Sequence, residues 1–393
     1  MKMNLPVSGA KLIVFKRFGD SRGYFNELYN EKKYPLVRDW KQVSFSKSSK
    51  NVLRGLHCSP YGKFITCTKG AFYDVIADFR PESPTFGRWC RILLSDTNCR
   101  QVYVPPKCGH GFYTLEDDTQ ALYLQEGCFH PENECDVHPF DPFIRVQWPL
   151  IDKTQWPTLS AKDEAAPNLS GRMSTPNEPR RRVLVIGATG QLGSAIVEAY
   201  GAEHCIGTYC NTNTNPFYMH FDMTRALEDN YTEFLFDTVQ PSCVYVCTGM
   251  TWVDGCEQDV EKCTLLNHTA PVHVAKVARK FACKFVWYST DYVFDGTAGP
   301  CDENAAVNPL NQYGRSKRQG EIEVMTACAN ALVLRINGVY GPEELGKNFV
   351  YQVAENRLTQ VPSDQFGTPT YSRDIAHVSQ KLVDQNAHGL VHV

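Results

Sequence analysis

A short apolar run in the second half of the chain leads directly into a glycine-rich turn. The run is Val183–Ile186, and it is followed by Gly187-Ala188-Thr189-Gly190-Gln191-Leu192-Gly193. Glycines in such a turn let the backbone approach a pyrophosphate, and the amino end of the following helix stabilises the negative charge. The pattern therefore predicts a strand, a turn and a helix of an α/β fold, whose cofactor-binding residues are Gly187, Thr189, Gly190, Gln191, Leu192 and Gly193.

A tyrosine and a lysine farther along the chain predict what this cofactor does. Tyr313 and Lys317 are four residues apart, so they share one face of a predicted helix. A ketone that accepts hydride develops negative charge on its oxygen, to which Tyr313 can donate a proton. Lys317 can lower the pKa of that tyrosine and hold the nicotinamide ribose, and Thr290 can hydrogen-bond the same oxygen. An isolated pair of this spacing is usually a plain helix face, but here it follows the glycine-rich turn. Asp222 lies where we expect an adenine contact.

The 393 residues are enough for two domains of ordinary size. Residues 1–166 contain short apolar runs between glycines and prolines, for example 12–15, 71–76 and 101–105, which is typical of an antiparallel sandwich or barrel. We interpret 167–181 as a linker. From residue 182 to 393, expected strands at 183–186, 205–209, 243–247, 284–288 and 331–336 alternate with helices such as 270–281 and 313–327, which predicts a Rossmann-type, doubly wound parallel sheet.

The bulk composition excludes several classes of partner. The formal net charge is -3, with 40 Lys and Arg against 43 Asp and Glu, so neither nucleic acid nor an anionic membrane is expected as the main partner. We expect no signal peptide, and we find no apolar run of the roughly 18 residues that span a bilayer. The 16 cysteines are scattered without a Cys-x-x-Cys pair. This is typical of reduced thiols, so we expect a cytoplasmic protein.

The first half carries a histidine close to two cations. His57 lies near Arg54 and Lys63, a combination that suits removal of a proton next to a carbonyl while the cations stabilise the enolate. A carboxylate behind the histidine would fix its tautomer. The alternatives are a structural histidine or a metal site. A metal-binding cupin has the pattern His-x-His, whereas Cys58 and Ser59 follow His57, so we expect no metal.

The second half resembles the extended short-chain dehydrogenase/reductase family, and within it the dTDP-4-dehydrorhamnose reductases. The resemblance is carried by Ser289-Thr290-Asp291-Tyr292-Val293-Phe294-Asp295-Gly296, with Thr251-Trp252-Val253-Asp254, Asn267 and Tyr371-Ser372-Arg373-Asp374. It implies reduction of a nucleotide-linked 4-keto-6-deoxysugar by NADPH or NADH. The end of the second strand, 207–212, carries neither an acid nor an arginine, so the choice of cofactor stays open. Family members continue with further helices, so we expect a domain shortened at its C-terminus.

The first half, from about residue 12 to 167, resembles the dTDP-4-dehydrorhamnose 3,5-epimerases. The motifs are Phe18-Gly19-Asp20, Asn51–His57, Ser83-Pro84-Thr85-Phe86-Gly87, Gly109-His110-Gly111-Phe112 and Leu159–Asp163. The resemblance implies a cupin-like jelly-roll barrel that pairs into a homodimer. It also implies roles for seven residues: His57 as base, Asp163 as its partner, Lys63 and Arg54 on the enolate, His110 in the pocket, and Gln42 and Glu27 on the nucleotide.

The chain departs from this second pattern at one position. The family carries a tyrosine as proton donor just before the Pro-Glu segment, and this chain has Phe129 there. Loss of a general acid commonly costs a factor of about 10² to 10⁴ in rate. His130 or a water could substitute, or the domain could perform only part of the double epimerisation. The loop between His57 and Lys63 is also shorter than is typical.

The two resemblances are consecutive steps of one conversion. Epimerisation at C3 and C5 of a UDP- or dTDP-linked 4-keto-6-deoxyglucose gives the substrate that the reductase converts to the L-rhamnose nucleotide, so we expect a bifunctional enzyme comparable to the fused part of plant rhamnose synthases. The alternative is an NADP-binding regulatory or partly inactive homologue, since the regulatory β subunit of methionine adenosyltransferase resembles the same reductases. A third possibility is an enzyme that has kept only one of the two activities.

Overall fold

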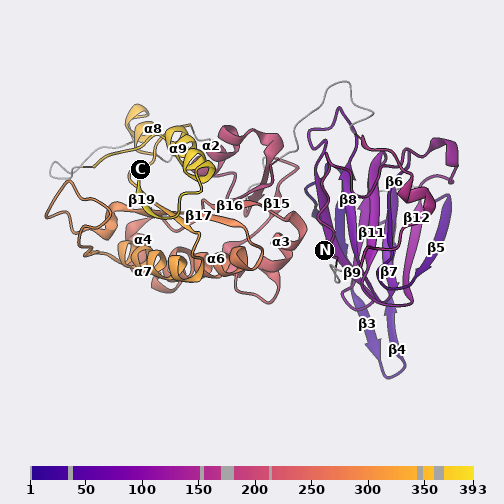
Figure 1. Cartoon of the computed structure of the whole chain (residues 1–393). Coiled ribbons are helices and arrows are strands. Elements are labelled where there is room, and N and C mark those ends of the chain that lie inside the picture. Colours follow the sequence, from indigo (N-terminus) through magenta and orange to yellow (C-terminus); the bar gives the residue numbers. More distant parts are fainter. Residues whose placement is uncertain are drawn as a thin grey trace. The chain divides into compact units, whose positions relative to one another are not determined.

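The computed structural model describes residues 2–33, 39–150, 155–169, 181–211, 215–342, 348–357 and 367–393. The chain divides into two compact units, the first built on residues up to 180 and the second on most residues from 181 onward. Most of the expected linker at 167–181 lies outside the described residues. Figure 1 shows one all-β unit and one unit in which helices cover a sheet.

The N-terminal unit is a sandwich of two antiparallel sheets, as the sequence predicts. The larger sheet has the strand order β1 (Lys2–Asn4), β2 (Lys11–Val14), β10 (Arg100–Val104), β7 (Lys63–Lys69), β12 (Thr119–Gln125) and β5 (Gln42–Ser48). The smaller sheet has the order β6 (Leu53–Cys58), β11 (Cys108–Thr114), β8 (Ala71–Asp78) and β9 (Trp89–Ser95). A separate hairpin pairs β3 (Arg17–Asp20) with β4 (Gly23–Asn26). Two short helices, η1 (Pro131–Asn133) and α1 (Ala161–Glu164), follow the last strand.

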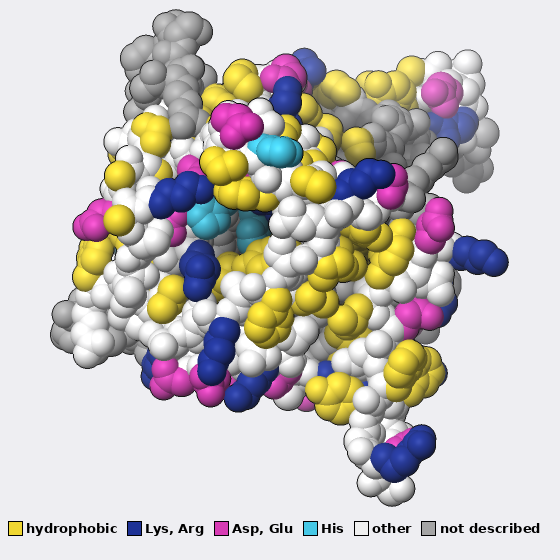
Figure 2. All heavy atoms as spheres, turned by 90° about the vertical axis from the view of Figure 1, so that its right-hand side faces the viewer, with side chains coloured by type: hydrophobic (Ala, Val, Ile, Leu, Met, Phe, Trp, Pro, Cys, Tyr) yellow, Lys and Arg dark blue, Asp and Glu magenta, His cyan; other side chains and the backbone are white. Residues whose placement is uncertain are grey.

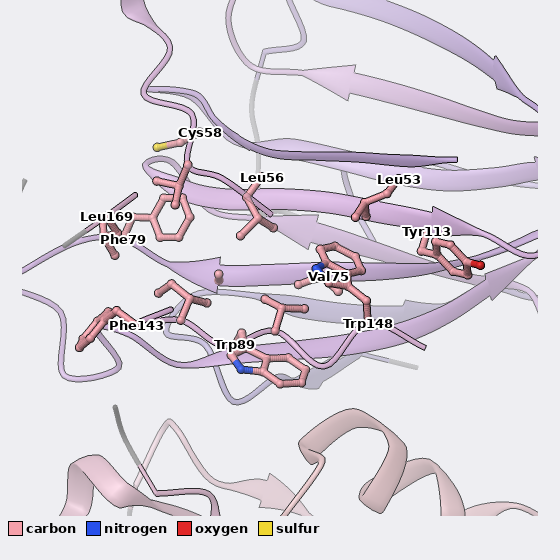
Figure 3. Packing of buried hydrophobic residues seen from close by; sticks show 14 of the residues in the cluster. Leu53, Leu56, Cys58, Val75, Phe79, Trp89, Tyr113, Phe143, Trp148 and Leu169 are labelled. Carbon is pink, nitrogen blue, oxygen red and sulfur yellow. The ribbon is translucent and has the colours of Figure 1, made fainter. Parts of the chain in front are cut away.

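The face of the smaller sheet that points away from the larger one holds the main apolar core of this unit. Leu53, Val75, Trp89 and Tyr113 project from the strands, and residues from the segment after β12 cover them, namely Val137, Phe143, Ile144, Val146, Trp148 and Leu169 (Figure 3). Burial of these side chains removes a large apolar surface from water, and this favours the orientation in which that face of the smaller sheet is covered by the segment after β12. The opposite face of the smaller sheet is therefore turned toward the larger sheet, and a ring contact of 6.3 Å between the centroids of His110 and Tyr123 joins the two.

An irregularity in β6 brings two predicted site residues to this inner face. In a regular strand Arg54 and His57, three residues apart, would point to opposite faces. Here His57 pairs with His110 and Arg54 with Phe112, so β6 carries one extra residue and both side chains face inward. The extra residue lies at Gly55, where φ is 113° and an added Cβ would come within 2.6 Å of the Gly111 Cα, so only glycine fits.

The C-terminal unit is a seven-stranded sheet with the order β15 (Met219–His220), β14 (Cys205–Tyr209), β13 (Val183–Ile186), β16 (Cys243–Val246), β17 (Lys284–Thr290), β18 (Leu332–Ile336) and β19 (Gly389–His392). The pairings from β14 through β19 are parallel. The expected Rossmann-type fold is confirmed, and the expected strands agree with the structure to within two residues at each end.

Helices lie on both faces of this sheet, as Figure 1 shows. One face carries α2 (Gln191–Tyr200) and α9 (Ser372–Asp384), and the other carries α6 (Ala270–Lys280) and α7 (Gln312–Ala327). The other α-helices in the described part of this unit are α3 (Tyr231–Val239), α4 (Val253–Gln258), α5 (Val260–Thr264) and α8 (Phe349–Ala354). Among the described residues, no helix has the length and apolar character needed to cross a bilayer.

Replacing Trp89 with alanine tests the core of the sandwich. Trp89 is 1% exposed, so the substitution leaves a large cavity, and we expect the free energy of unfolding of the N-terminal unit to fall by about 3–5 kcal/mol. Urea unfolding followed by fluorescence measures this. Trp156→Ala is the matched control, because Trp156 is 68% exposed and its loss should cost below about 1 kcal/mol. Equal losses in the two variants would contradict the description of the core.

Candidate active sites

The first candidate site is built around a histidine and a buried carboxylate. His57 Nε2 lies 2.7 Å from Asp163 Oδ1, and their side chains are 31% and 4% exposed. Asp163 occupies the first turn of α1, whose N-cap Ser160 accepts a hydrogen bond from the Asp163 backbone N–H. Because the carboxylate accepts the proton on Nε2, Nδ1 carries the lone pair and can act as a base.

The same carboxylate supports the bulge in β6. The second oxygen of Asp163 accepts a hydrogen bond from the Gly55 backbone N–H at 3.5 Å. Burial alone would raise the pKa of Asp163, but hydrogen bonding to His57 and the charge of that ring, with the bonds from Ser160 and Gly55, lower it below its usual value. Asp163 therefore stays ionised and keeps the imidazole in one orientation.

Cations and a second histidine line the same space between the sheets. His110 Nε2 lies 2.7 Å from Asp74 Oδ1, and both side chains are buried. Burial raises the pKa of Asp74 and also lowers the pKa of Lys63, the first residue of β7. Arg54 donates from Nε to the Ser48 hydroxyl at 3.0 Å. In Figure 2, which looks onto this unit, histidine side chains lie at the bottom of a hollow with Lys and Arg side chains near its rim.

Of the two expected nucleotide contacts, the structure brings one to this space. Gln42 begins β5 and pairs in register with Gln125, which in turn pairs with Lys63, so the three side chains share the inner face of the larger sheet. Glu27 instead follows the β3–β4 hairpin and forms an ion pair of 2.6 Å with Lys33. Its contact with a nucleotide stays a prediction.

Phe129 stands at the edge of this space. Its side chain is 47% exposed, its backbone N–H donates to Gln42 Oε1 at 2.9 Å, and its ring centroid lies 5.8 Å from the Lys162 ammonium. Lys162 lies in α1, the helix that also carries Asp163, so Phe129 packs beside that helix and the first residue of β5. A phenyl ring at this position can exclude water but cannot donate a proton. No group of three or more His, Cys, Asp or Glu side chains in the described part of the chain could hold a metal ion.

The second candidate site begins at the carboxyl end of β13. Gly187 has a φ of 84°, and an added Cβ on Gly193 would lie 2.1 Å from the Gly187 carbonyl oxygen, so both positions need glycine for the turn to close on helix α2. Thr189 and Gly190 are exposed, and Gly190 caps the helix without a side chain that could occupy its N–H groups. Gln191 donates to the Gly341 carbonyl at 3.1 Å. These residues fit a dinucleotide, because the exposed backbone at the helix start can receive its pyrophosphate.

Asp222 follows the edge strand β15. Its Oδ1 accepts hydrogen bonds from the backbone N–H and the hydroxyl of Thr224, at 2.9 and 2.8 Å. Partial burial would raise the pKa of Asp222, but these bonds outweigh burial and lower it. The carboxylate is therefore ionised and fixed in direction, which suits the expected contact with an amino group of adenine.

Tyr313, Lys317 and Thr290 come together between α7 and the end of β17. Both helix residues are nearly buried, and the Lys317 ammonium donates to the Tyr288 carbonyl at 2.9 Å while lying 4.7 Å above the ring of Trp287. Burial lowers the pKa of Lys317 to about 8. Burial also raises the pKa of Tyr313 well above its usual value, opposed by a hydrogen bond with Thr290. The phenol thus holds its proton until charge develops next to it.

Asn267 is a residue of this site that the spacing argument did not select. It is fully buried in a π-helical turn, Leu265–Thr269, and it exchanges two hydrogen bonds of 2.9 Å with the backbone of Met250. An added Cβ on Gly249 would lie 2.8 Å from Asn267 Oδ1 and 3.4 Å from the Lys317 ammonium nitrogen, so the amide borders the lysine. Its only signal in the sequence is the resemblance, since no local motif surrounds it.

Comparison with known proteins places both halves in families. The family model for dTDP-4-dehydrorhamnose 3,5-epimerase matches residues 4–171, and the model for the RmlD substrate binding domain matches residues 181–393. The dTDP-4-dehydrorhamnose 3,5-epimerase of Salmonella typhimurium is 41% identical over 168 residues, which are 41% of this chain and 90% of that protein. The enzyme of that name from Mycobacterium tuberculosis is 39% identical over 172 residues, 42% of this chain and 85% of that protein.

The chain belongs to both families. It therefore joins an epimerase domain of the dTDP-4-dehydrorhamnose 3,5-epimerase family to a reductase domain of the RmlD type, and it is an enzyme of nucleotide-rhamnose synthesis. The RmlD family implies a nicotinamide cofactor. Among solved structures, the Mycobacterium tuberculosis epimerase is similar with a TM-score of 0.42 and 38% identity over 44% of this chain and 90% of that one. A dTDP-4-dehydrorhamnose reductase from Clostridium acetobutylicum has a TM-score of 0.47 and 31% identity over 54% and 73% of the two chains.

The glycine-rich turn of the RmlD-type domain can be tested by filling it. Gly193→Ala places a methyl group against the Gly187 carbonyl, so the turn must shift and we expect binding of NADPH or NADH to weaken at least about tenfold, or about 1.4 kcal/mol. Isothermal titration calorimetry measures the affinity. Ser194→Ala, at the next and exposed position of α2, should bind as the unchanged protein does. Equal affinities in all three proteins would show that the cofactor is held elsewhere.

Proposed function

We propose that this chain converts a UDP- or dTDP-linked 4-keto-6-deoxy-D-glucose to the corresponding L-rhamnose nucleotide, by epimerisation at C3 and C5 followed by reduction at C4. The observation that carries the proposal is the presence of two different acid–base constellations in one chain. His57 lies 2.7 Å from Asp163 in one unit, and Tyr313, Lys317 and Thr290 meet in the other.

In the epimerase domain, His57 Nδ1 takes the proton from the carbon next to the C4 carbonyl. The electron pair of that C–H bond moves toward the carbonyl oxygen, and the positive charges of Lys63 and Arg54 stabilise the resulting enolate. Asp163 stabilises the imidazolium that His57 becomes. Gln42, on the inner face with Lys63, orients the nucleotide part of the substrate together with Glu27, and His110 shapes the sugar pocket.

In the reductase domain, the C4 carbonyl oxygen lies between the Tyr313 phenol and the Thr290 hydroxyl. In this site NADPH or NADH, when bound, would supply the hydride for C4. Tyr313 donates its proton to the oxygen as charge develops there, and the Lys317 ammonium stabilises the tyrosinate that remains. The Gly187–Gly193 turn and Asp222 would hold the other end of the cofactor.

We further propose a homodimer formed through the barrel, in the cytoplasm. The proposal of a dimer is supported by exposed apolar side chains on the separate hairpin and on the edge strand β5, which are Phe18, Tyr24, Phe25, Val43 and Phe45. The proposal of a reducing compartment is supported by the cysteines, which the structure holds as thiols.

Two substitutions separate the activities. Tyr313→Phe should abolish oxidation of the cofactor while solvent deuterium still enters C3 and C5, because the barrel does not need Tyr313. His57→Ala should stop deuterium entry but still allow reduction of a substrate that has already been epimerised. NMR of the sugar and absorbance at 340 nm measure the two reactions. If either variant loses both, the two sites are not independent and the proposal is wrong.

The pH dependence of reduction tests the role of Lys317. Because burial lowers its pKa to about 8, the ammonium loses its charge as the pH rises through that value. We therefore expect kcat/KM for reduction, which reflects the free enzyme, to fall above about pH 8. Lys280→Met, at an exposed lysine that ends α6, should keep this profile. A kcat/KM that stays constant up to pH 10 would contradict the assigned role.

A further inference from the structure

The epimerase domain lacks a proton donor at the position where its family resemblance places one. Inversion at carbon needs a proton removed from one face and another delivered to the opposite face. His57 serves one face, and Phe129 carries no acidic proton. The need for another proton donor follows from the epimerisation that we propose. Because His57 lies on the smaller sheet, this donor has to come from the side of the larger sheet, which faces His57.

Tyr61 is placed next to the segment that carries Phe129. It lies in the turn between β6 and β7, two residues before Lys63. An added Cβ on Gly127 would come within 2.4 Å of the Tyr61 Cδ1, so the phenol ring packs directly on the Gly127 backbone. Gly127 is two residues before Phe129. The absence of a side chain at Gly127 thus gives Tyr61 room beside the position where the family has its tyrosine.

The hydroxyl group of Tyr61 is held at the inner face of the larger sheet. It accepts a hydrogen bond from Gln125 Nε2 at 3.1 Å and donates to Glu134 Oε1 at 3.4 Å. Gln125 points to the same face as Lys63, and the Lys63 ammonium lies 5.7 Å from the centroid of the Tyr61 ring. The phenol is therefore close to the cation expected to stabilise the enolate.

A continuous chain of hydrogen bonds connects Tyr61 with Phe129. The Phe129 N–H donates to Gln42, Gln42 donates to the Ser44 hydroxyl at 2.8 Å, and this hydroxyl donates to Gln125 Oε1 at 2.8 Å. Gln125 then donates to the Tyr61 hydroxyl. The side chains that hold Phe129 in place therefore also position Tyr61.

Glu134 connects Tyr61 by hydrogen bonds to the end of β6, the strand that carries His57. Its second carboxylate oxygen accepts from the Ser59 hydroxyl at 2.6 Å, and Ser59 is two residues after His57. The Tyr61 hydroxyl thus lies between the inner face of the larger sheet and the end of β6. Burial raises the pKa of Tyr61, and the charge of Glu134 adds to this, so the phenol is protonated at neutral pH.

Tyr123 is the other phenol on this inner face, and its surroundings suit the role less well. Its hydroxyl lies 3.0 Å from the Ser46 hydroxyl on the neighbouring strand. It pairs in register with Ile65, two residues beyond Lys63, and its ring contacts His110. No carboxylate is hydrogen-bonded to it among the described residues, whereas Tyr61 has Glu134 to return a proton from solvent.

We propose that Tyr61 is the catalytic acid of the epimerase domain. It takes the role of the family tyrosine, whose position is occupied by Phe129 in this chain. His57 removes a proton from the sugar carbon, and the electron pair forms the enolate. The enolate then collapses: the C4 carbonyl re-forms, and the carbon takes the proton of the Tyr61 hydroxyl on the opposite face. The tyrosinate regains a proton from solvent beside Glu134, and His57 loses its proton to solvent.

Tyr61→Phe separates proton removal from inversion. In deuterated water without nicotinamide, with UDP- and dTDP-4-keto-6-deoxyglucose as substrates, His57 can still remove a proton and return a deuteron to the same face. We therefore expect NMR to show deuterium entry with retention at a rate within a few-fold of the unchanged protein, while formation of the epimer falls by about 10² to 10⁴. Tyr113→Phe, which removes a phenol hydroxyl from the outer face of the smaller sheet, is the matched control and should leave both rates unchanged.

The double variant Tyr61→Phe/Phe129→Tyr tests the same point by rescue. A phenol restored at position 129 should recover at least about tenfold of the lost epimer formation. The assignment is overturned if Tyr61→Phe forms epimer at the unchanged rate, if Tyr123→Phe alone abolishes inversion, or if Tyr61→Phe loses deuterium entry as well. An unchanged protein that neither exchanges protons nor forms epimer would instead overturn the proposed function itself, and the donor with it.

Discussion

The chemistry that we propose for the first domain depends on the buried carboxylate of Asp163. It receives the imidazole of His57 on one oxygen and the backbone N–H of Gly55 on the other. The first contact fixes the tautomer that leaves Nδ1 free to take a proton. The second holds the extra residue of β6, without which Arg54 and His57 would face opposite sides of the sheet. One ionised group therefore sets both the tautomer and the orientation of His57, the proposed base.

The second domain uses burial for a related purpose. Lys317 and Tyr313 lie in an environment that disfavours their charged forms, so the lysine has a lowered pKa and the phenol keeps its proton. Charge that develops on a substrate oxygen in such a place is stabilised more strongly than it would be in water. The two domains thus use the same physical principle for different steps. In each domain, the surroundings of a pair of titratable side chains set their protonation state before the reaction.

Much of this arrangement could be predicted from the sequence. The remaining parts could not be predicted, because they depend on contacts between residues that are far apart in the chain. Strand 205–209 and the start of α7 were predictable because apolar runs, glycine turns and the Tyr-x-x-x-Lys spacing are local. The bulge at Gly55 was not, since it depends on how closely Gly111 approaches. The placement of Tyr61 was not predictable either, because it depends on Gly127 and Gln125, more than 60 residues away. Glu27 forms an ion pair with Lys33 after the hairpin, and its expected contact with the nucleotide stays a prediction.

We propose that one pocket exchanges protons on carbon and that a separate pocket delivers hydride to the neighbouring carbonyl carbon. The most direct measurement is a complete reaction of the unchanged protein in deuterated water, with an unlabelled 4-keto-6-deoxyglucose nucleotide and unlabelled NADPH, followed by NMR of the product. We expect an L-rhamnose nucleotide with solvent deuterium at C3 and C5 and ordinary hydrogen from the cofactor at C4. A reduced product without deuterium at C3 and C5, or deuterium at C4, would contradict the assignment of the two reactions to two pockets.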